Sequence, residues 1–334
     1  MGDLAFASEG WICAEEPEAD LEKVPDSNEL QRDIFNSESV PLSVILTRMR
    51  TNKLSLLVTA VLMIAAIASV TAQNRPAAPA SLRLYVLDCG TIGSMNPASY
   101  DLKAEEIKGS LDFVTPCYLV VHPSGTLMWD VGQIADTNFP ADGSPAKQGV
   151  FTSTRKLLPQ LAAVGYKPSD ITYLAMSHYH TDHTANANEF ASSTWIVQEA
   201  ERNAMFGQAA PRQAQPASYS KLKDAKSIVV ANKDHDVFGD GSVVIKFTPG
   251  HSPGHQSLFL KFAKTGPVVL SGDLYHYPEE RSLDRVPTFD SDRDQTRKSR
   301  QGLEQFLTQS KAQLWIQHDS SVYSKWARAP QYID

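Results

Sequence analysis

The sequence lacks an excess of basic charge, an internal repeat and an apolar run of membrane-spanning length. It has 31 Lys and Arg against 38 Asp and Glu among 334 residues, a formal net charge of -7. No basic face is evident, so nucleic acid is not an expected partner. With 42% hydrophobic and 21% charged residues, the chain has an ordinary globular composition. It is long enough for one large domain or two small ones.

The negative charge is concentrated in the first 48 residues. This segment holds eleven Asp and Glu against three Lys and Arg, while the rest of the chain is nearly neutral, with 28 basic and 27 acidic residues. Because the segment shows no sustained periodicity, we expect residues 1–48 to be a disordered acidic extension. They are either a cytoplasmic tail on an anchor or an artefact of a start site assigned upstream of Met49, and we favour the artefact.

Residues 49–72 have the layout of a secretory signal peptide. Arg50 and Lys53 form a short positive region, Leu54 to Ala68 are nearly all apolar, and small residues close the segment. The apolar stretch is shorter than the ~20 residues that a spanning helix needs. We therefore predict a periplasmic or secreted protein, with membrane contact only if residues 54–70 remain uncleaved as an anchor. The sequence does not decide the oligomeric state.

The three cysteines are Cys13, Cys89 and Cys117. Export would place the last two in an oxidising compartment, where a disulfide is allowed. Both lie at the edges of predicted strands. The sequence leaves open a disulfide between them and two buried free thiols, because it does not fix their separation.

After a linker at 73–81, the patterns predict strands interrupted by helices. Strands are predicted at 82–88, 117–122, 125–130, 171–176, 194–197, 227–230, 242–247, 257–262, 267–271 and 313–316, and helices at 153–164, 198–206 and 292–309. Residues 90–115 and 207–220 are predicted to be loops, and loops of such length usually serve binding. The order indicates packed sheets with helices outside, in one hydrolase domain over residues 73–334.

One short stretch, SHYHTDHTAN at 177–186, directly follows the predicted strand 171–176. Its ligand-type residues, in the spacing H-x-H-x-D-H, are His178, His180, Asp182 and His183. Imidazole and carboxylate are the ligands that zinc-like cations prefer. Packing does not explain this density, and four such groups within six residues cannot point the same way. The pattern therefore predicts two adjacent divalent cations, with Zn²⁺ favoured.

Three further ligand candidates each close a predicted strand. They are His251 in TPGH, Asp273 in SGD and His318 in IQHD. One cation would take His178, His180 and His251, and the other would take Asp182, His183 and His318. Asp273 would bridge the two, which would then lie roughly 3.5–4 Å apart.

The order of these motifs resembles the metallo-β-lactamase superfamily and, within it, the dinuclear N-acyl-homoserine lactonases. The resemblance spans about residues 82–334, and the stretches DCG, PCYLVVHP, TPGHSPGHQSLF and SGDLYHYPEER support the lactonase branch. It implies an α+β fold, an αββα sandwich of two mixed β-sheets flanked by helices, with the metals at one edge. It also implies that Asp130, in WDVG, orients a metal-binding His.

The resemblance further implies a secreted metal-dependent hydrolase that opens the lactone ring of N-acyl-homoserine lactones, which is quorum quenching. A metal-bridging hydroxide would attack the carbonyl carbon, and Asp182 would pass a proton to the leaving alkoxide. These lactonases typically use a Tyr shortly after the bridging Asp. Here Tyr275, His276 and Tyr277 occupy that neighbourhood, and alternation would put the two Tyr on one side. We list Tyr275 as the catalytic candidate and His276 as its rival.

Other functions share some of these features. A phosphotriesterase or a β-lactamase on the same scaffold would use similar ligands, although zinc β-lactamases usually lack a residue like Asp273. A di-iron redox enzyme would carry a Glu where His180 stands. A membrane-tethered, non-catalytic metal-binding protein would have no need of all seven ligands. Of the remaining histidines, we expect His122 and His235 at the surface and His255 in a structural hydrogen bond.

Overall fold

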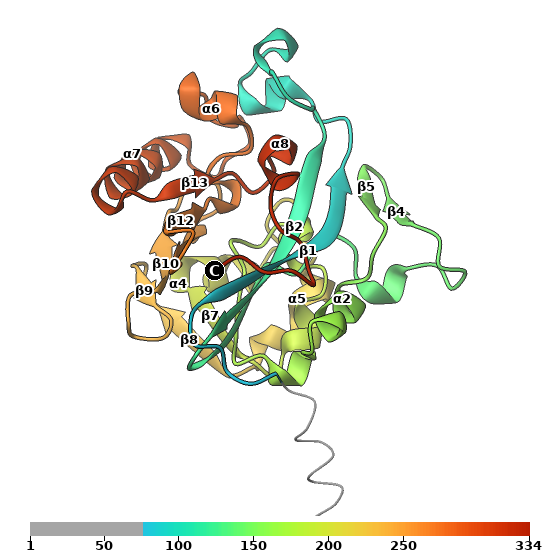
Figure 1. The fold of residues 1–334 in the computed structure, drawn as a ribbon. Coiled ribbons are helices and arrows are strands. Elements are labelled where there is room, and N and C mark those ends of the chain that lie inside the picture. Colours follow the sequence, from blue (N-terminus) through green and yellow to red (C-terminus); the bar gives the residue numbers. More distant parts are fainter. Residues whose placement is uncertain (1–75) are drawn as a thin grey trace, which may run out of the picture. The chain divides into compact units, whose positions relative to one another are not determined.

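The computed structural model describes residues 76–334. The predicted acidic extension at 1–48, the signal segment at 49–72 and the start of the linker lie outside the described residues, so these assignments stay predictions. Among residues 76–334, none of the helices combines the length and the apolar character needed to cross a bilayer. This part of the chain contains two sheets with helices on their outer faces (Figure 1).

The larger sheet has eight strands in the order β4-β5-β1-β2-β3-β6-β7-β8. They are β1 (Arg83–Ile92), β2 (Phe113–His122), β3 (Gly125–Trp129), β4 (Ala146–Gln148), β5 (Phe151–Ser153), β6 (Tyr173–Ala175), β7 (Thr194–Gln198) and β8 (Ser227–Val230). Neighbouring strands are antiparallel from β4 to β3 and parallel from β3 to β8, so the sheet is mixed.

The smaller sheet has five strands in the order β13-β12-β11-β10-β9. They are β9 (His235–Asp236), β10 (Val243–Phe247), β11 (Gln256–Lys261), β12 (Pro267–Leu270) and β13 (Gln313–Trp315). Only β12 and β13 run parallel, because the helical segment that joins them returns the chain in the same direction. This sheet is mixed as well.

The main apolar core lies between the two sheets. Leu84, Tyr118 and Trp129 of the larger sheet belong to the same cluster as Ile245 and Leu258 of the smaller one, and all five are fully buried. Alternate residues along each strand face this layer. Burial of a side chain of this size contributes about 1.5–3 kcal/mol, which makes this layer a main source of stability.

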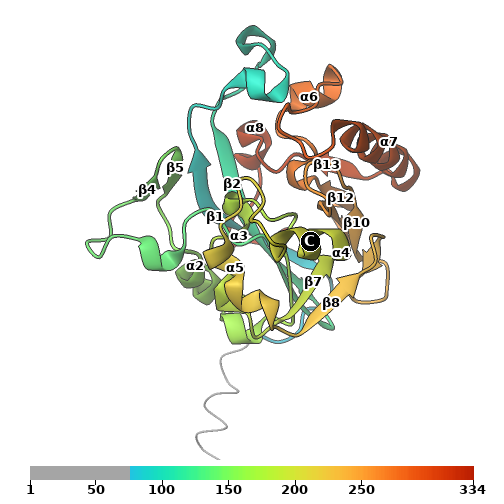
Figure 2. The same cartoon turned by 180° about the vertical axis from the view of Figure 1, so that it is seen from behind.

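Helices cover both outer faces. On the larger sheet, Leu157 and Leu161 of one helix and Met205 of another pack against the strands, and on the smaller sheet Leu303 and Leu307 do so. The helices are α2 (Leu157–Ala163), α3 (Thr181–Thr184), α4 (Glu199–Met205), α5 (Pro216–Tyr219), α6 (Pro278–Ser282), α7 (Arg293–Ser310) and α8 (Ser320–Tyr323). Figure 1 shows α7 beside the smaller sheet, and Figure 2 shows α2, α4 and α5 on the larger one. The predicted αββα sandwich of two mixed sheets is confirmed.

The predicted elements differ from the observed ones mainly around Gly90. The sequence predicts a strand that ends at residue 88 and a loop that begins at Gly90, but β1 continues to Ile92, and β2 begins earlier than predicted, at Phe113. The pairing of β1 with β2 shifts between Asp88 and Thr91, and Gly90 has a φ of 124° that favours glycine. The predicted loop at 90–115 is therefore shorter, covering residues 93–112.

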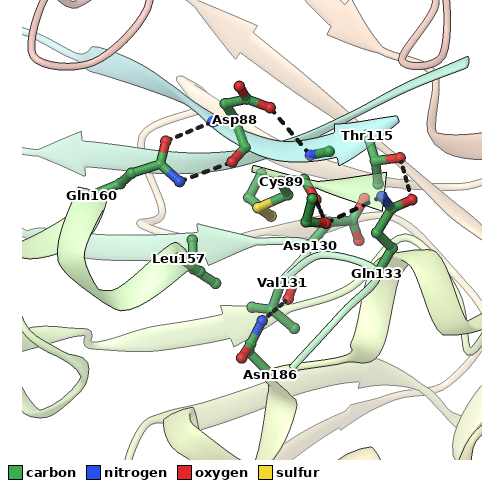
Figure 3. Close-up of a disulfide and its surroundings, with 12 residues drawn as sticks. Asp88, Cys89, Thr115, Asp130, Val131, Gln133, Leu157, Gln160 and Asn186 are labelled. Carbon is green, nitrogen blue, oxygen red and sulfur yellow. Dashed lines mark hydrogen bonds between the residues drawn. A yellow bond between two sulfur atoms is a disulfide. The ribbon is translucent and has the colours of Figure 1, made fainter. Parts of the chain in front are cut away.

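Cys89 of β1 and Cys117 of β2 form a disulfide, with their Cα atoms 5.9 Å apart (Figure 3). Of the two alternatives left open by the sequence, the bridge is the one present. A Cβ atom on Gly132 would lie 3.3 Å from Sγ of Cys89, so the loop after β3 packs directly on the bridge. Because that loop also carries Asp130, the disulfide supports a residue of the candidate site.

Candidate metal centre

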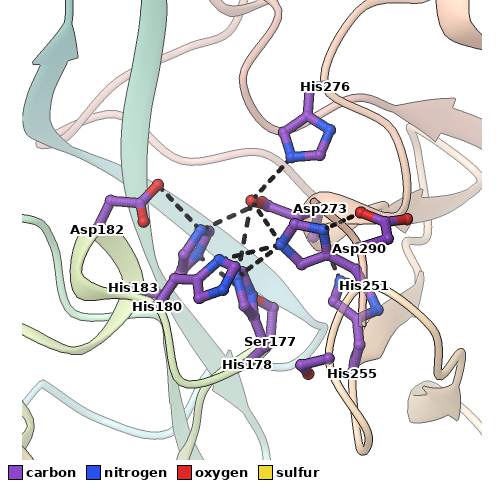
Figure 4. Close-up of polar contacts among 12 residues, drawn as sticks. Ser177, His178, His180, Asp182, His183, His251, His255, Asp273, His276 and Asp290 are labelled. Atoms are coloured by element: carbon purple, nitrogen blue, oxygen red, sulfur yellow. Dashed lines mark hydrogen bonds and ion pairs between the residues drawn. The ribbon is translucent and has the colours of Figure 1, made fainter. Parts of the chain in front are cut away.

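The seven predicted ligand residues come together where strands of both sheets end. His178, His180, Asp182 and His183 follow β6 of the larger sheet. His251 follows β10, Asp273 follows β12 and His318 follows β13, all of the smaller sheet. Figure 4 shows side chains of both groups converging from the two sides, among them His178, His180, Asp182, His183, His251 and Asp273. All seven are buried or nearly so, with at most 9% of the residue surface exposed.

The first group contains three imidazoles whose ring nitrogens face one another. The Nε2 atom of His251 lies 3.1 Å from Nε2 of His178 and 3.1 Å from Nδ1 of His180. Oδ2 of Asp273 lies 3.5 Å from Nε2 of His251 and 3.7 Å from Nε2 of His178. These four atoms surround one point, and one ligand atom from each residue lies within 4.8 Å of the others. The group suits a single cation.

The second group contains two imidazoles and two carboxylates. Nε2 of His183 lies 3.2 Å from Oδ2 of Asp182 and 3.2 Å from Oδ1 of Asp273. Nε2 of His318 lies 3.0 Å from the same Asp273 oxygen. Asp273 therefore turns one carboxylate oxygen toward each group. This is the arrangement expected of a residue that bridges two cations.

The hydrogen bonds of the ring nitrogens that point away from the centre support metal binding. The Nδ1 of His251 lies 2.8 Å from Oδ1 of Asp290, and the Nδ1 of His318 lies 2.8 Å from the carbonyl oxygen of Val114. Because both partners only accept, Nδ1 carries the proton in each ring and Nε2 presents a lone pair to the centre. Among the described residues, Nε2 of His183 and Oδ1 of Asp273 are buried without a hydrogen bond of good geometry, despite their 3.2 Å separation.

Asp130 supports His183, as the resemblance implied. Its Oδ2 accepts a hydrogen bond of 2.9 Å from Nδ1 of His183 and one of 2.6 Å from Nε2 of Gln317. Its Oδ1 accepts from the backbone N–H of Ser177. Asp130 is fully buried and has a φ of 55°, an uncommon value for a residue other than glycine. The strained loop therefore places a carboxylate where it fixes the ring of a ligand residue.

Burial and neighbouring charges divide the histidines into two types. Burial lowers the pKa of His178 and His180 well below the usual histidine value, and adjacent imidazoles lower it further. Burial also opposes charge on His183, but the carboxylates of Asp182 and Asp273 outweigh it and raise its pKa. A cation among these groups would take the place of the His183 proton, so metal binding would release protons.

His276, rather than Tyr275, faces the centre. Nε2 of His276 lies 3.2 Å from Oδ2 of Asp273, and its Nδ1 lies 3.2 Å from Oε1 of Glu280. The Tyr275 hydroxyl instead donates to Glu304 of α7, and its ring packs in the third apolar cluster. The structure therefore places His276, and not the Tyr275 hydroxyl, beside the candidate ligands, while a catalytic role for either residue stays a prediction.

A cavity of about 400 Å³ adjoins the centre. Its polar end contains five of the predicted site residues, namely His180, Asp182, Asp273, His276 and His318. Its apolar wall comes from β1, β2, β5, the loops beside these strands and the segment before α7, with Ile92, Met95, Tyr100, Phe113, Val150, Phe151 and Phe289. The cavity can therefore hold a molecule with one reactive polar end and one apolar chain.

A larger groove of about 610 Å³ lies elsewhere, between α2, α5 and η3 (Asp136–Asn138). Two of the amide side chains that line it, those of Asn186 and Asn188, already have partners within the protein. Asn186 donates to the carbonyl of Val131 and accepts from Asp136, and Asn188 bonds the backbone at both ends of its amide. This groove contains neither of the two groups of candidate metal ligands, so we assign the active site to the smaller cavity.

The model of the metallo-beta-lactamase superfamily matches residues 111–308, which include six of the seven ligand candidates and Asp130. The chain belongs to the metallo-beta-lactamase superfamily. The predicted family, the fold and the class of metal-dependent hydrolases are thereby confirmed. Binding of cations by the seven named residues stays a prediction, which their geometry supports.

Relatives in this superfamily include proteins named as lactonases. The chain is 28% identical over 266 residues to the N-acyl homoserine lactonase AttM of Azorhizobium caulinodans, covering 76% of this chain and 99% of that protein. It is 29% identical over 229 residues to an N-acyl homoserine lactonase of Bacillus cereus, covering 65% and 86%. It also resembles a structure of an N-acyl homoserine lactone hydrolase with N-hexanoyl-L-homoserine at the catalytic metal center, with a TM-score of 0.63, 25% identity and coverage of 75% and 98%.

Three expectations for the other histidines had mixed outcomes. His255 makes structural hydrogen bonds, as expected, because its Nε2 accepts from the backbone N–H of Asp273 and its Nδ1 contacts Thr248. The surface position predicted for His122 is wrong, since only 6% of its surface is exposed. Its ring stacks on Phe238 and pairs with Asp240. His235 is half-buried rather than fully at the surface.

Sequence reasoning missed the acidic residues that hold the site together. Asp290 lies in a charged stretch before α7, Glu280 follows a proline in α6, and Glu201 lies in the short helix α4. No spacing in the sequence links them to the ligand motifs. Gln317 is the exception, because its position next to His318 was a usable signal.

Proposed function

We propose that this protein is an exported dinuclear lactonase that opens the ring of N-acyl homoserine lactones. The observation that carries the proposal is the division of the two Asp273 oxygens between two groups of imidazoles, at the polar end of an apolar cavity. A lactone headgroup fits the polar end, and an acyl chain fits the apolar wall. The similarity to proteins named as lactonases, over nearly their whole length, supports the same substrate class.

We propose Zn²⁺ as the native cation, because the ligand set is composed of imidazoles and carboxylates. His178, His180 and His251 would hold one ion, Asp182, His183 and His318 the other, and Asp273 both. When bound, the ions supply a nucleophilic hydroxide near neutral pH and Lewis acidity toward the lactone carbonyl.

In this proposal, His276 stabilises the negative charge that develops on the carbonyl oxygen. Its ring lines the cavity, and Nε2 points toward Asp273 and the reacting end. Glu280 holds the ring from behind and accepts from the backbone N–H of His276. Glu280 is itself fixed by Arg300 at 2.6 Å. A donor that is fixed in advance needs little reorganisation when charge develops.

Asp182 is placed to handle the leaving group. It lines the cavity, and its Oδ2 lies between the Nε2 atoms of His183 and His318, at 3.2 and 3.5 Å. We propose that it carries a proton to the ring oxygen as that oxygen leaves as an alkoxide. The proton comes from the attacking water, so no Ser or Cys nucleophile is needed.

Export to the periplasm or beyond is part of the proposal. The Cys89–Cys117 bridge supports it, because disulfides persist in oxidising compartments. An extracytoplasmic lactonase would meet acyl-homoserine lactones outside the cytoplasm, where its activity would quench quorum sensing.

The test follows ring opening of N-acyl homoserine lactones of several chain lengths by proton release. The full chain and its H178A variant are compared, with metal content measured on the same samples. We expect about two metals per chain in the wild type, and metal loss together with loss of activity in the variant. Two metals without lactone hydrolysis would redirect the proposal to phosphotriesters or β-lactams. A metal-free wild type would contradict it outright.

A further inference from the structure

Glu201 is a buried carboxylate that has no part in the chemistry proposed above. It lies in α4, with 3% of its surface exposed. Oε1 accepts a hydrogen bond of 2.8 Å from the backbone N–H of Tyr179. Oε2 accepts one of 2.7 Å from the Ser252 hydroxyl and one of 2.8 Å from the backbone N–H of Gly254. One side chain therefore satisfies three donors from two distant segments.

Those two segments carry the three-histidine group. Tyr179 lies between His178 and His180 in the loop after β6, and Ser252 directly follows His251 in the loop after β10. The ring nitrogens of these histidines converge at 3.1 Å although the loops come from different sheets. The Glu201 carboxylate accepts hydrogen bonds from the backbones of both loops and does not line the cavity. It is thus a direct tie between the two sources of ligands.

Close packing reinforces this tie. A Cβ atom on Gly254 would lie 2.4 Å from the backbone nitrogen of Glu201 and 2.6 Å from its Cβ, so only glycine allows α4 to approach this turn so closely. The helix therefore fixes the position of the carboxylate as well as its hydrogen bonds.

Stability alone does not account for a carboxylate at this place. No Lys or Arg in the part of the chain that the structure describes forms an ion pair with Glu201. Burial raises its pKa to about 7, and the hydrogen bonds from Ser252, Gly254 and Tyr179 offset only part of that effect. A buried carboxylate without a cationic partner is costly, whereas an apolar side chain could fill the same space. What the carboxylate adds is a fixed position of the loop after β6 relative to the loop after β10.

We propose that Glu201 is a positioning residue that holds His178, His180 and His251 around one cation and leaves the other cation position largely unaffected. The second group has its own supports, since Asp130 orients His183 and the Val114 carbonyl orients His318. The proposal rests on the proposed dinuclear centre, but not on the identity of the substrate.

The experiment measures the two stepwise zinc affinities of the full-length, Zn²⁺-loaded chain by competition with a chelator. In E201Q, a single amide oxygen replaces two acceptors and the amide N–H₂ faces a donor. We expect one affinity to fall by about 10–100-fold, the range typical of groups that orient metal ligands, and the other to change by less than about 3-fold. After dialysis against the chelator, the variant should retain one zinc and the wild type two.

A spectroscopic measurement identifies the weakened position. With ¹¹³Cd²⁺ in place of zinc, the wild type should give two NMR signals, and H318A assigns the one that belongs to the second group. E201Q should shift or lose only the other signal. T126V is the matched control, because Thr126 is also buried and hydrogen-bonded but lies in β3, away from the ligand loops. It should lower stability and leave both zinc affinities unchanged.

Unchanged affinities in E201Q, or an equal loss at both positions, would overturn the proposal. If E201Q fails to fold, S252A decides, because it removes one of the three donors and keeps both backbone donors. S252A should lower the zinc affinity of the same position selectively, by a smaller factor than E201Q. An equal loss of affinity at both positions, or no loss at either, would again contradict the proposal. A wild type that binds two zinc ions without opening lactones would reject the lactonase and leave this test intact.

Discussion

The Nε2 atom of His276 lies 3.2 Å from Oδ2 of Asp273, the carboxylate shared by the two groups of imidazoles. This contact puts an N–H donor at the reacting end of the cavity, three residues after the proposed bridging ligand. Tyr275, in between, turns toward Glu304 of α7. Of these two neighbours, His276 is therefore the catalytic candidate and Tyr275 is a packing residue.

The first prediction compares these two neighbours. H276A should lower kcat by about 10²–10³-fold, the usual loss when one oxyanion donor is removed. Zinc content should remain at two per chain. Y275F should change kcat by less than about threefold, because the Tyr275 hydroxyl only donates to Glu304. Steady-state kinetics on zinc-loaded proteins measures both, and a larger loss in Y275F than in H276A would reverse the assignment.

The second prediction concerns Asp130. In D130N, an amide replaces the carboxylate that accepts from His183 and Gln317, and its N–H₂ must face one of the donors. The zinc affinity of the Asp182–His183–Asp273–His318 group should fall by about 10–100-fold. Chelator competition measures it, with T126V as the control for a buried polar change elsewhere. E201Q is expected to weaken the other group instead, so the double variant E201Q/D130N should lose both ions.

The third prediction concerns the disulfide. Cys89 and Cys117 are 28 residues apart, and the loop-entropy relation assigns such a bridge about 3–4 kcal/mol of stability. The double variant C89S/C117S should lose roughly this amount in urea unfolding. Because the bridge packs on Gly132 near Asp130, catalytic activity should also become more sensitive to heat. An unchanged urea midpoint would show that packing alone holds β1 against β2.

The fourth prediction is a pH dependence away from the centre. Hydrogen bonds from Ser242, followed by the contact with His122, lower the pKa of Asp240 to about 2. Since a depressed pKa favours the folded state only while the carboxylate is ionised, this contribution is present above about pH 4 and is lost as the pH falls toward 2. D240N should therefore lower the free energy of unfolding, measured in urea at pH 6, by less than about 1 kcal/mol, because the group is largely exposed.

The same comparison at pH 3 should give a smaller difference between D240N and the wild type. Acid affects the rest of the protein alike in D240N and in the wild type, so the comparison between them reports on the site of Asp240. A difference that grows on acidification would contradict the assigned direction of the pKa shift.

The sequence predicted which residues gather at the candidate centre because the motifs that carry them follow apolar strands. H-x-H-x-D-H, TPGH, GD and the late His are local patterns, and their meeting point follows once the strands belong to two packed sheets. His276 and Tyr275 point to different sides, as alternation predicted, because the backbone is extended at Tyr275 and at Tyr277. Alternation alone could not show which of the two sides faces the centre.

The supporting residues were beyond sequence reasoning for another reason. Glu201 and Asp290 contact the ligand loops across 22 and 39 residues, and nothing in their own neighbourhoods reflects those contacts. The strands β4 and β5 were missed because three residues are too few to show a period. The disulfide needed a Cα–Cα distance, which only the pairing of β1 with β2 supplies.

The seven candidate ligands are divided between the sheets, with four after β6 of the larger sheet and one each after β10, β12 and β13 of the smaller one. Cations bound there would join two sheets that otherwise meet through the apolar core and through a few hydrogen bonds, such as those of Glu201 and the one from Gln317 to Asp130. Metal removal should therefore weaken the association of the two sheets as well as stop turnover. The metal-free protein should then be more susceptible to proteolysis. Where zinc is scarce, the protein would then be degraded faster, so its lifetime would depend on the zinc concentration.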